Sequence, residues 1–295
     1  MTERLPLLLP EIAVFIGTCL VLVMGLSPSV ALRKMTAMVT AGTLLLAGIL
    51  AVNTNASYAA DIGMPMPGLI GFSKALIAFV GLLLLMLVAG TVDRRYERMI
   101  QAGHAVYNPS RALRAEFYAF FLFSLMGAML CASADDLIWL FLALELTSLP
   151  TYVMVVMSRA GGEARGWTRA QESSVKYFFL GALGAAIFLY GFALLYGGTG
   201  STQLVEIGAV LGTEPNAIAV IGFVMAIIGV SFKIAAVPMH FYTADVYDGA
   251  SAPLAAFLAF TPKTAGIITL VMLTSVAGWG YIDSGLPMGG DRGTL

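Results

Sequence analysis

The chain has 295 residues, of which 59% are hydrophobic and only 11% are charged, and its mean hydropathy is +0.89. Soluble domains carry about 25% charged residues, so this composition excludes an ordinary soluble domain and indicates an integral membrane protein. The formal net charge of -1 leaves no basic face for nucleic acid, and we expect partners to bind through surface that is buried in lipid.

The N-terminal part of the chain begins with an apolar run from 5 to 26 that is long enough to cross a bilayer. This run lacks the basic start and the small-residue cleavage site of a signal peptide, so we expect the helix to be retained. Cys19 and Cys131 fall on separate apolar segments without metal-ligand spacing. We predict that both cysteines are small core residues and that they form no disulfide.

Apolar runs of about twenty residues recur along the chain, each sufficient for a hydrocarbon core of about 30 Å. The stretches 93–113 and 158–172 are longer and polar, so we predict loops there. The segment from Thr202 to Gly212 fits a short surface helix and a plain loop equally well. The sequence therefore predicts an all-α polytopic bundle with spans at 5–26, 31–52, 72–92, 114–132, 135–157, 173–197, 217–237 and 254–277.

The sixteen Lys and Arg residues are distributed unevenly over the connectors. The first, third and fifth connectors hold ten of them, whereas the even connectors and the two ends hold Arg4, Lys74 and Arg292. Because basic loops stay on the cytoplasmic side, we predict that the odd connectors face the cytoplasm or the matrix and that the N-terminus faces the opposite side. The remaining three, Lys176, Lys233 and Lys263, fall inside predicted spans.

Ionisable residues within the membrane usually face the bundle interior and pair with one another. Glu145 lies ten residues after Asp135, and Lys263 ten residues after Pro253, which places both at a depth of about 15 Å. Lys176 lies nearer to the surface, where its side chain can also extend to the interface. We predict that Glu145 and the three lysines form a polar line across neighbouring helices.

Prolines accompany these charges, and we predict helix breaks at Pro150, Pro238 and Pro262. Pro150 follows Glu145 by five residues, and Pro238 follows Lys233 by the same spacing. A proline cannot donate to the carbonyl four residues before it, so each spacing would leave a free carbonyl directly after the charge. Kinking of the helices for packing is the alternative for each proline.

A buried lysine whose charge depends on a nearby carboxylate can bind and release a proton, so the pattern predicts proton transport. Histidine is the residue type that most often carries protons in proteins, so we expect His240, in the polar turn after Pro238, to exchange protons with an aqueous face. A structural role for this histidine remains the alternative. The sequence shows no nucleotide-binding loop, no metal-ligand spacing and no nucleophile motif.

The chain resembles the subunit N (subunit 2) family of the proton-pumping NADH:quinone oxidoreductase, respiratory complex I. Three segments carry this resemblance from the fourth predicted helix onward, while the first three helices agree only in general character. The stretch DVYDGASAP within the third segment favours this family over other antiporter-like subunits. The segments are LALELTSLPTYVMV (142–155), ESSVKYFFLGALGAAIFLYG (172–191) and FKIAAVPMHFYTADVYDGASAPLAAFLAFTPKTAG (232–266).

The resemblance implies an antiporter-like helix bundle with a discontinuous helix, and a role for each candidate residue. Glu145 is similar to the family's glutamate on helix 5, and Lys176 to a lysine of helix 6 that interacts with it. Lys233 is similar to the lysine of the broken helix 7, His240 to the histidine after the break, and Lys263 to the lysine of helix 8 that leads toward the second half.

The resemblance also implies an enzyme subunit of the electron-transport chain that translocates protons while other subunits reduce quinone. The subunit would hold no cofactor, because NADH, FMN, the iron–sulfur clusters and quinone belong to the parent complex. Its partners would be the lipid bilayer and the other membrane subunits of complex I, especially the neighbouring antiporter-like ones. We expect a multi-pass protein of the bacterial cytoplasmic membrane, with the mitochondrial inner membrane as the alternative and the N-terminus on the periplasmic side.

We expect three regions: N-terminal helices 1–3 (1–113), a proton-translocating repeat of helices 4–8 (114–277) and an exit loop or truncated end (278–295). Members of the family have about fourteen helices in inverted repeats, and about eight are expected here, so we expect a fragment. A subunit of a Mrp-type cation/proton antiporter is the alternative function. A non-catalytic scaffold whose charges join helices is the third hypothesis.

Overall fold

The computed structural model describes residues 2–89, 92, 94–104, 106, 113–157, 164–213 and 216–282, and its regular elements there are helices. They are the 3₁₀ helix η1 (Thr2–Leu8) and the α-helices α1 (Leu9–Gly25), α2 (Val30–Val52), α3 (Ala56–Asp61), α4 (Pro67–Val88), α5 (Arg94–Gln101), α6 (Arg114–Ala132), α7 (Leu137–Met157), α8 (Ala164–Thr199), α9 (Leu204–Thr213), α10 (Ala217–Lys233), α11 (Thr243–Gly249) and α12 (Ala252–Ile282).

The prediction of an all-α membrane protein is confirmed. Within the described residues, seven helices are long and apolar enough to cross a membrane, and they correspond to seven of the eight predicted spans. The eighth prediction, 217–237, was too long, because α10 ends at Lys233 after 17 residues. A helix of that length rises about 26 Å, so it reaches only part of the way toward the other end of the bundle before the chain turns.

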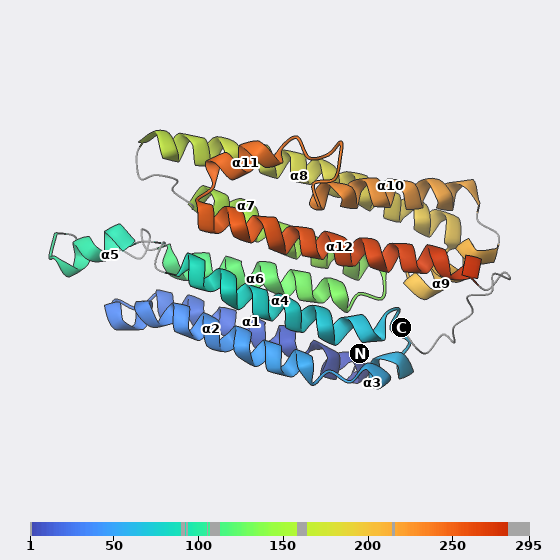
Figure 1. Ribbon diagram of the computed structural model, residues 1–295, viewed down its shortest axis with the longest axis horizontal. Coiled ribbons are helices and arrows are strands. Elements are labelled where there is room, and N and C mark those ends of the chain that lie inside the picture. The colour runs from blue at the N-terminus through green and yellow to red at the C-terminus, as the bar shows by residue number, and fades with distance from the viewer. Residues whose placement is uncertain are drawn as a thin grey trace.

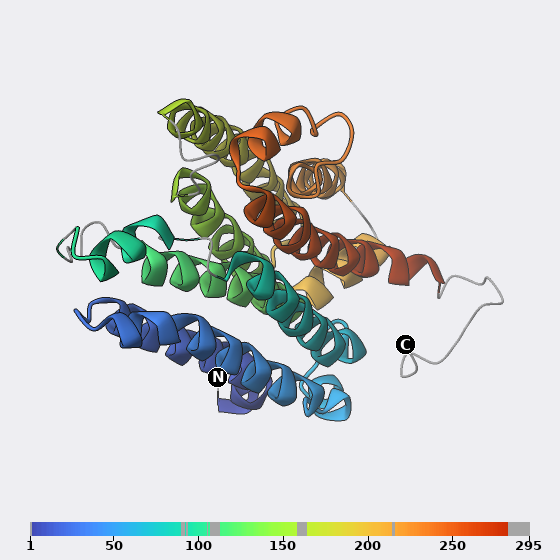
Figure 2. The ribbon, with the colours of Figure 1, turned by 60° about the vertical axis from the view of Figure 1, so that its left-hand side comes forward.

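The long helices lie side by side along the longest axis of the molecule (Figure 1). Helices α1, α2 and α4 pack together on one side, α6 and α7 form the middle, and α8 and α10 pack closely on the other side. Helix α12 contacts α6, α7, α9 and α10, so it joins the middle helices α6 and α7 to α10. Figure 2 shows α1 and α2 at the bottom of the view, below the other long helices.

Several element boundaries differ from the sequence predictions. The predicted loop 93–113 contains α5, and α8 begins at Ala164, inside the predicted loop 158–172. Residues 158–163 and much of 105–112 lie outside the described residues. The segment 202–212 is mostly helical, as α9, and its Leu204 and Ile207 are buried, because an amphipathic helix can bury one apolar face.

The predicted C-terminal region, 278–295, is helical at its start. Helix α12 continues to Ile282, five residues beyond the predicted end of the last span at 277, so this part is not an exit loop. Its composition explains the difference, because the residues after 277 include Trp279 and Tyr281, which membrane interfaces tolerate within a helix. The rest of that region, 283–295, lies outside the described residues.

Two of the three predicted helix breaks were wrong. Pro150 lies inside α7 and Pro262 lies inside α12, and both helices continue through the proline. A proline removes one backbone hydrogen bond, and neighbouring helices and hydroxyl side chains can compensate for that loss within a membrane bundle. In α7 the hydroxyls of Thr147, Ser148 and Thr151 donate to the carbonyls of Ala143, Leu144 and Ser148, so none of these three bonds replaces the donor that Pro150 removes from Leu146.

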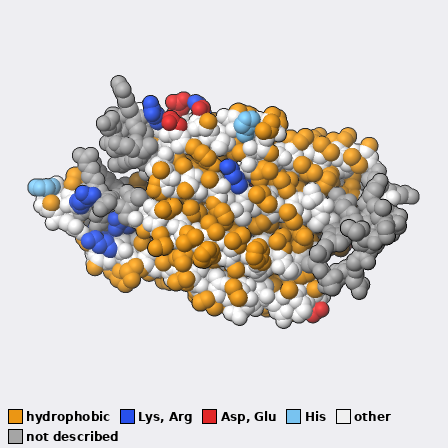
Figure 3. All heavy atoms as spheres, viewed as in Figure 1, with side chains coloured by type: hydrophobic (Ala, Val, Ile, Leu, Met, Phe, Trp, Pro, Cys, Tyr) orange, Lys and Arg blue, Asp and Glu red, His pale blue; other side chains and the backbone are white. Residues whose placement is uncertain are grey.

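The surface has the composition that a bilayer requires. Figure 3 shows a broad hydrophobic band over the middle of one face, with most of its Lys and Arg side chains gathered toward the end that holds α5. Cys131 is buried, as predicted, but Cys19 is exposed on α1. The prediction failed for Cys19 because a membrane helix is apolar on its lipid-facing side as well as on its packed side, so apolar character does not distinguish the two.

Candidate functional site: a buried ion pair at a broken helix

Lys233 and Glu145, far apart in the sequence, meet in the interior of the bundle. The Nζ atom of Lys233 donates to Oε1 of Glu145 at 3.0 Å and to Oγ of Ser148 at 2.7 Å. The Lys233 side chain is 4% exposed and that of Glu145 is 18% exposed. The pair is therefore screened from solvent, and its Coulomb energy is much larger than that of a surface pair.

The sequence of α7 explains how both partners of Lys233 reach it from one helix. Glu145 and Ser148 are three residues apart and so lie on the same helical face. Helix α6 approaches this turn closely at Gly127, where a Cβ atom would lie 2.5 Å from the backbone N of Thr147. Ser148 was missed in the sequence analysis, although the spacing of a hydroxyl three residues after a buried carboxylate was visible there.

The break in the helix directly after Lys233 has a definite geometry. Ala235 adopts a left-handed conformation with φ of 56°, and its N–H donates to the carbonyl of Phe232, while Ala236 N–H donates to that of Ser231. These two bonds form a Schellman motif, which ends the helix at Lys233 with Ile234 as its C-cap. The predicted break was at Pro238, whereas α10 ends five residues earlier, at Lys233, so the Schellman motif rather than the proline terminates the helix.

This termination places the ammonium group of Lys233 at the C-terminal end of α10. The last carbonyls of a helix carry partial negative charge, so a cation is favoured there. The hydroxyl of Tyr242, on the far side of the break, donates to the carbonyl of Phe232 at 2.9 Å. The ring of Tyr242 stacks on the ring of Phe232 with centroids 4.3 Å apart, which fixes the returning chain against the end of α10.

Lys263 lies on α12, near the same break, and is partly buried. Its Nζ atom lies 5.5 Å from the ring centroid of Tyr247, on α11. A small cavity of about 10 Å³, room for roughly one water molecule, is lined by both Lys233 and Lys263 together with Tyr242, Thr243 and Tyr247, among others. The structure therefore brings Lys233 and Lys263 to one polar cavity.

Two hydroxyl groups of residues that line this cavity are buried and lack a hydrogen-bond partner among the described residues: Oγ1 of Thr243 and the OH of Tyr247. Buried hydroxyls are nearly always satisfied, and water is the usual partner where no protein group is available. Both residues belong to the polar segment after Pro238, whose hydroxyls were not singled out individually from the sequence. A water bound to them would occupy a cavity that both Lys233 and Lys263 border.

Lys176 does not join this interior group. Its Nζ atom lies 2.8 Å from Oδ2 of Asp245 and 2.8 Å from Oε1 of Glu172, and its side chain is 44% exposed. The interaction with Glu145 that the resemblance implied is therefore replaced by partners at the end of the bundle. Glu172 is four residues away on the same helix, and α11 brings Asp245 across from the other side, so two nearer carboxylates compete for the ammonium group.

His240 lies in the turn between α10 and α11, and it is exposed. Its carbonyl accepts the N–H of Thr243 at 3.0 Å, which helps to start α11. The structure thus places the histidine beside the break, as predicted, but on the surface rather than on the line between Glu145 and Lys263.

A second buried ion pair lies in the N-terminal helices and was not predicted. Nζ of Lys74, on α4, lies 2.7 Å from Oε1 of Glu11, on α1, and it donates to the carbonyl of Leu7 at 2.6 Å. The side chains of Lys74 and Glu11 are 0% and 4% exposed. The assignment of Lys74 to a connector was wrong, because Lys74 lies within the predicted span 72–92 and is seven residues into α4, which begins at Pro67. The charge of Glu11 makes a lysine at this buried position possible.

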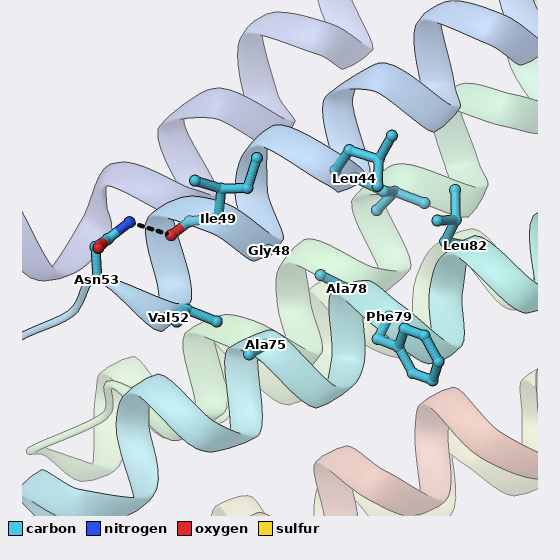
Figure 4. Close-up of a pocket in the computed structure, with 10 residues that line it drawn as sticks. Leu44, Gly48, Ile49, Val52, Asn53, Ala75, Ala78, Phe79 and Leu82 are labelled. Carbon is cyan, nitrogen blue, oxygen red and sulfur yellow. Dashed lines mark hydrogen bonds between the residues drawn. The ribbon is translucent and has the colours of Figure 1, made fainter.

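An apolar groove of about 440 Å³ lies between α2 and α4 (Figure 4). It is lined by Leu44, Gly48, Ile49, Ala78 and Phe79 among others, and it holds no ionisable side chain. The described residues also contain no group of three His, Cys, Asp or Glu that could hold a metal ion. The chemistry of the described chain therefore lies with its buried charges.

Comparison with known proteins connects this geometry to one family. Residues 134–282 match the family described as NADH:quinone oxidoreductase/Mrp antiporter, TM. The chain is 34% identical, over 91% of its length, to the NADH-quinone oxidoreductase subunit N of Alkalilimnicola ehrlichii, of which the match covers 52%. The chain thus spans about half the length of the curated relatives it matches.

Two solved structures have the same fold. One is a chain of respiratory complex I from Thermus thermophilus with bound aureothin, at a TM-score of 0.65 and 23% identity, covering 93% of this chain and 63% of that chain. The other is a chain of the Mrp complex from Dietzia sp., at a TM-score of 0.70 and 18% identity, covering 94% of this chain and 49% of that one. The similarity includes the first helices, which lie outside the family match.

Proposed function

Because the chain belongs to the NADH:quinone oxidoreductase/Mrp antiporter transmembrane family, we propose that it acts as a proton-translocating membrane subunit of NADH:quinone oxidoreductase, complex I. The observation that carries the proposal is the buried contact of Lys233 with Glu145 and Ser148 at the end of a broken helix. A lysine in such a site changes its proton affinity when its carboxylate partner moves or is neutralised.

The proton path runs from the Glu145–Lys233 pair to Lys263 through the cavity that both lysines line. Water bound to the hydroxyls of Thr243 and Tyr247 bridges the two side-chain nitrogens, so the ammonium group of Lys233 passes a proton to Lys263 when Lys263 is a neutral amine, and Lys233 is left as the neutral amine. His240, exposed at the break, exchanges protons with the adjoining phase. Lys176, held by Asp245 and Glu172, sets the charge at the neighbouring end.

The proposed subunit carries no redox centre, and the parent complex supplies NADH oxidation and quinone reduction. Its partners are the other membrane subunits of that complex, in the cytoplasmic membrane of a bacterium. The basic connectors that hold α5 and the start of α8 face the cytoplasm, which places the N-terminus on the periplasmic side. The regions proposed are the helices of 1–113, the proton-translocating helices of 114–277 and the segment after them.

A subunit of a Mrp-type antiporter is the second candidate, favoured by the likeness to the Mrp complex at a TM-score of 0.70. In that case the same site would exchange Na⁺ for protons. A sodium ion prefers several oxygen ligands, whereas here an ammonium group already occupies the carboxylate and the hydroxyl that face the site. The arrangement therefore supports proton transfer better than cation exchange.

The proposal is tested with Lys233→Ala in the full-length parent protein, measured as proton pumping against quinone reduction in membrane vesicles. We expect an assembled complex in which pumping is lost. Ser231→Ala is the matched control, because Ser231 lies on the same helix and its hydroxyl bonds only the carbonyl of Ile227 among the contacts of the described chain. Unchanged proton stoichiometry in an assembled Lys233→Ala complex would contradict the proposal.

Sodium provides the discriminating condition between the two candidates. Pumping that requires Na⁺, in vesicles whose protein purifies without flavin or iron–sulfur subunits, would favour the antiporter. Loss of assembly in Lys233→Ala with normal activity in the fraction that does assemble would favour a scaffold role, in which the charges join helices.

A further inference from the structure

The end of the bundle that holds the N-terminus contains a cluster of buried polar atoms apart from the Glu145–Lys233 site. Both carboxylate oxygens of Glu11, Oγ of Ser133 and Oδ1 of Asp135 have no hydrogen-bond partner of adequate geometry among the described residues. All four atoms are hidden from the surface. Unsatisfied buried oxygens in one place indicate water that completes their hydrogen bonds.

These atoms are arranged between the ion pair and the aqueous edge. Lys74 contacts Glu11 at 2.7 Å, and the Ser133 hydroxyl lies near the Glu11 carboxylate. Asp135, two residues further on, is held by Arg4 at 2.5 Å. The Arg4 side chain is 42% exposed, so the cluster reaches solvent at its outer member.

A cavity of about 10 Å³, enough for roughly one water molecule, lies in the same corner. Arg4, Leu7 and Ser133 line it, together with Leu8, Met64 and Trp139. Leu7 is also the residue whose carbonyl binds Lys74, so the cavity reaches the immediate neighbourhood of the ion pair. Ser133 lines the cavity, and Glu11 is not among the lining residues.

We propose that Glu11 and Lys74 form a second proton-binding site, which exchanges protons with water at the N-terminal end of the bundle through the Ser133–Asp135–Arg4 corner. A hydronium ion entering this corner gives one proton to a carboxylate oxygen of Glu11 and becomes water. Glu11 becomes a neutral carboxylic acid, and the ammonium group of Lys74 keeps its bond to the Leu7 carbonyl. Release of the proton to water reverses the step.

The bond to Leu7 makes this exchange feasible without loss of the lysine. In the 3₁₀ helix η1 the carbonyl of Leu7 would accept from residue 10, which is Pro10 and has no N–H. The carbonyl is therefore free for Lys74, which has a partner whether or not Glu11 is ionised. A lysine bound solely by the carboxylate would instead be left buried and unpaired when Glu11 takes up a proton.

A purely structural pair would differ in one respect. An ion pair that only joins α1 to α4 is most stable when the carboxylate has its acceptor sites filled by the protein and water is excluded. Here the carboxylate contacts one ammonium group, while up to four acceptor sites are available to it. The unfilled acceptor sites of Glu11 lie next to a cavity that leads to the exposed Arg4. A site that takes up and releases protons requires both features.

The groups that influence this site come from every neighbouring element. They are Lys74 on α4, Arg4 on η1, and Asp135 and Asp136 in the turn between α6 and α7. Asp136 is bound by the backbone N–H of Trp139 at 2.6 Å, so its charge is fixed toward α7. With Asp136 set aside, the acidic groups around the cavity are Glu11 and Asp135, and the basic groups are Lys74 and Arg4. The net charge of this cluster is therefore close to zero when Glu11 is ionised.

The proposal is tested by infrared spectroscopy of the parent protein in its complex during a pH titration, as the difference between wild type and Glu11→Gln. We expect a carbonyl band of a protonated carboxyl group that grows on acidification and is absent from Glu11→Gln. A Glu11 that remains ionised at every pH, or protonated at every pH, would overturn the proposal.

Water access is measured independently, in case Glu11→Gln does not assemble. In a background with Cys19 and Cys131 replaced by alanine, Ser133→Cys should react with a charged, membrane-impermeant thiol reagent added on the side of the N-terminus. Ser124→Cys is the matched control, since Ser124 is fully buried on α6, the helix that ends directly before Ser133, and its hydroxyl donates to the carbonyl of Thr147. We expect labelling at least about tenfold faster at position 133, and equal rates would overturn the proposal.

Both measurements are independent of the proposed function, because neither reads proton pumping. Failure of the titration and of the labelling would remove the second site and leave the role of Lys233 untouched. Unchanged proton pumping in an assembled Lys233→Ala complex would remove the proposed path and leave the chemistry of Glu11 as measured.

Discussion

The two buried lysine–glutamate pairs of this chain are chemically alike and structurally different. Lys233 ends a helix and is bound by two side chains of α7, whereas Lys74 lies within an unbroken helix and is bound by a side chain and a backbone carbonyl. The Lys233–Glu145 pair borders a cavity that Lys263 also lines, and the Lys74–Glu11 pair lies near a cavity that leads to Arg4. A buried pair by itself thus defines no function, since its connections decide what it can do.

The comparison also reverses an expectation about backbone carbonyls. A carbonyl freed by Pro238 was expected beside Lys233, but the hydrogen bonds of that lysine go to side chains. The lysine that binds a carbonyl freed by a proline is Lys74, which bonds the carbonyl of Leu7. The difference follows from where each helix is irregular. At α10 the Schellman motif uses the nearby carbonyls itself, while at the junction of η1 and α1 Pro10 leaves one unbonded.

The strongest test of this comparison is Lys74→Ala against Lys233→Ala. Removing Lys74 leaves Glu11, 4% exposed, without its counter-ion, and we expect a loss of about 3–5 kcal/mol in the free energy of unfolding. Lys233→Ala should cost less, because Glu145 is 18% exposed and is partly hydrated already. Thermal unfolding of the solubilised protein measures both.

The control is the double variant Glu11→Gln/Lys74→Met, which removes both charges and should recover most of the lost stability. If Lys74→Ala proved no more destabilising than Lys233→Ala, the N-terminal pair would not be the more deeply buried of the two.

Gly127→Ala tests how firmly α7 is held. The added Cβ atom would meet the backbone of Thr147 at 2.5 Å, which no side-chain rotation can relieve, so we expect a loss of about 1–3 kcal/mol. Proton pumping should fall as well, because the turn that carries Glu145 and Ser148 must shift. Gly42→Ala, on α2, is the matched control, since its Cβ atom would have no neighbour within 4 Å. Equal stabilities for the two variants would contradict the close approach of α6 to α7.

Ala235→Gly tests the helix termination. Alanine at a φ of 56° is strained, and glycine adopts this conformation without that cost, so a gain of about 1 kcal/mol or less in stability is expected. Ala236→Gly serves as the control, because it adds flexibility to the unfolded chain without relieving strain. A destabilising effect of Ala235→Gly, measured by thermal unfolding, would show that the left-handed residue does not define the end of α10.

The smallest expected effect concerns Asp135. Burial raises the pKa of this carboxyl above its ordinary value of 3.8, although Arg4 opposes the shift. Because the folded protein holds the proton more tightly than the unfolded chain, this contribution to stability is complete below the ordinary pKa and is lost as pH rises through the raised value. Wild type should therefore lose stability relative to Asp135→Asn, by less than about 1 kcal/mol, over that acidic range. A stability difference that grows in favour of wild type with rising pH would reverse the sign of the argument.

The sequence alone determined the class of the protein and most of its spans, because long apolar runs have few stable conformations in a bilayer. It also isolated Glu145, Lys233 and Lys263, since ionised residues inside apolar runs are conspicuous there. It failed for Lys74 and Glu11, which lie near the ends of their runs. At such positions, composition cannot distinguish a residue at the interface from one in the core.

Tertiary structure decided the rest. Which carboxylate pairs with which lysine depends on helices that are distant in sequence, so Glu145 was brought to Lys233, while Asp245 and Glu172 took Lys176. The end of α10 was set by the conformation of Ala235, a residue without any local signal for a break. Pairing and helix termination depend on packing between segments, and a pattern along one chain carries little information about distances across it.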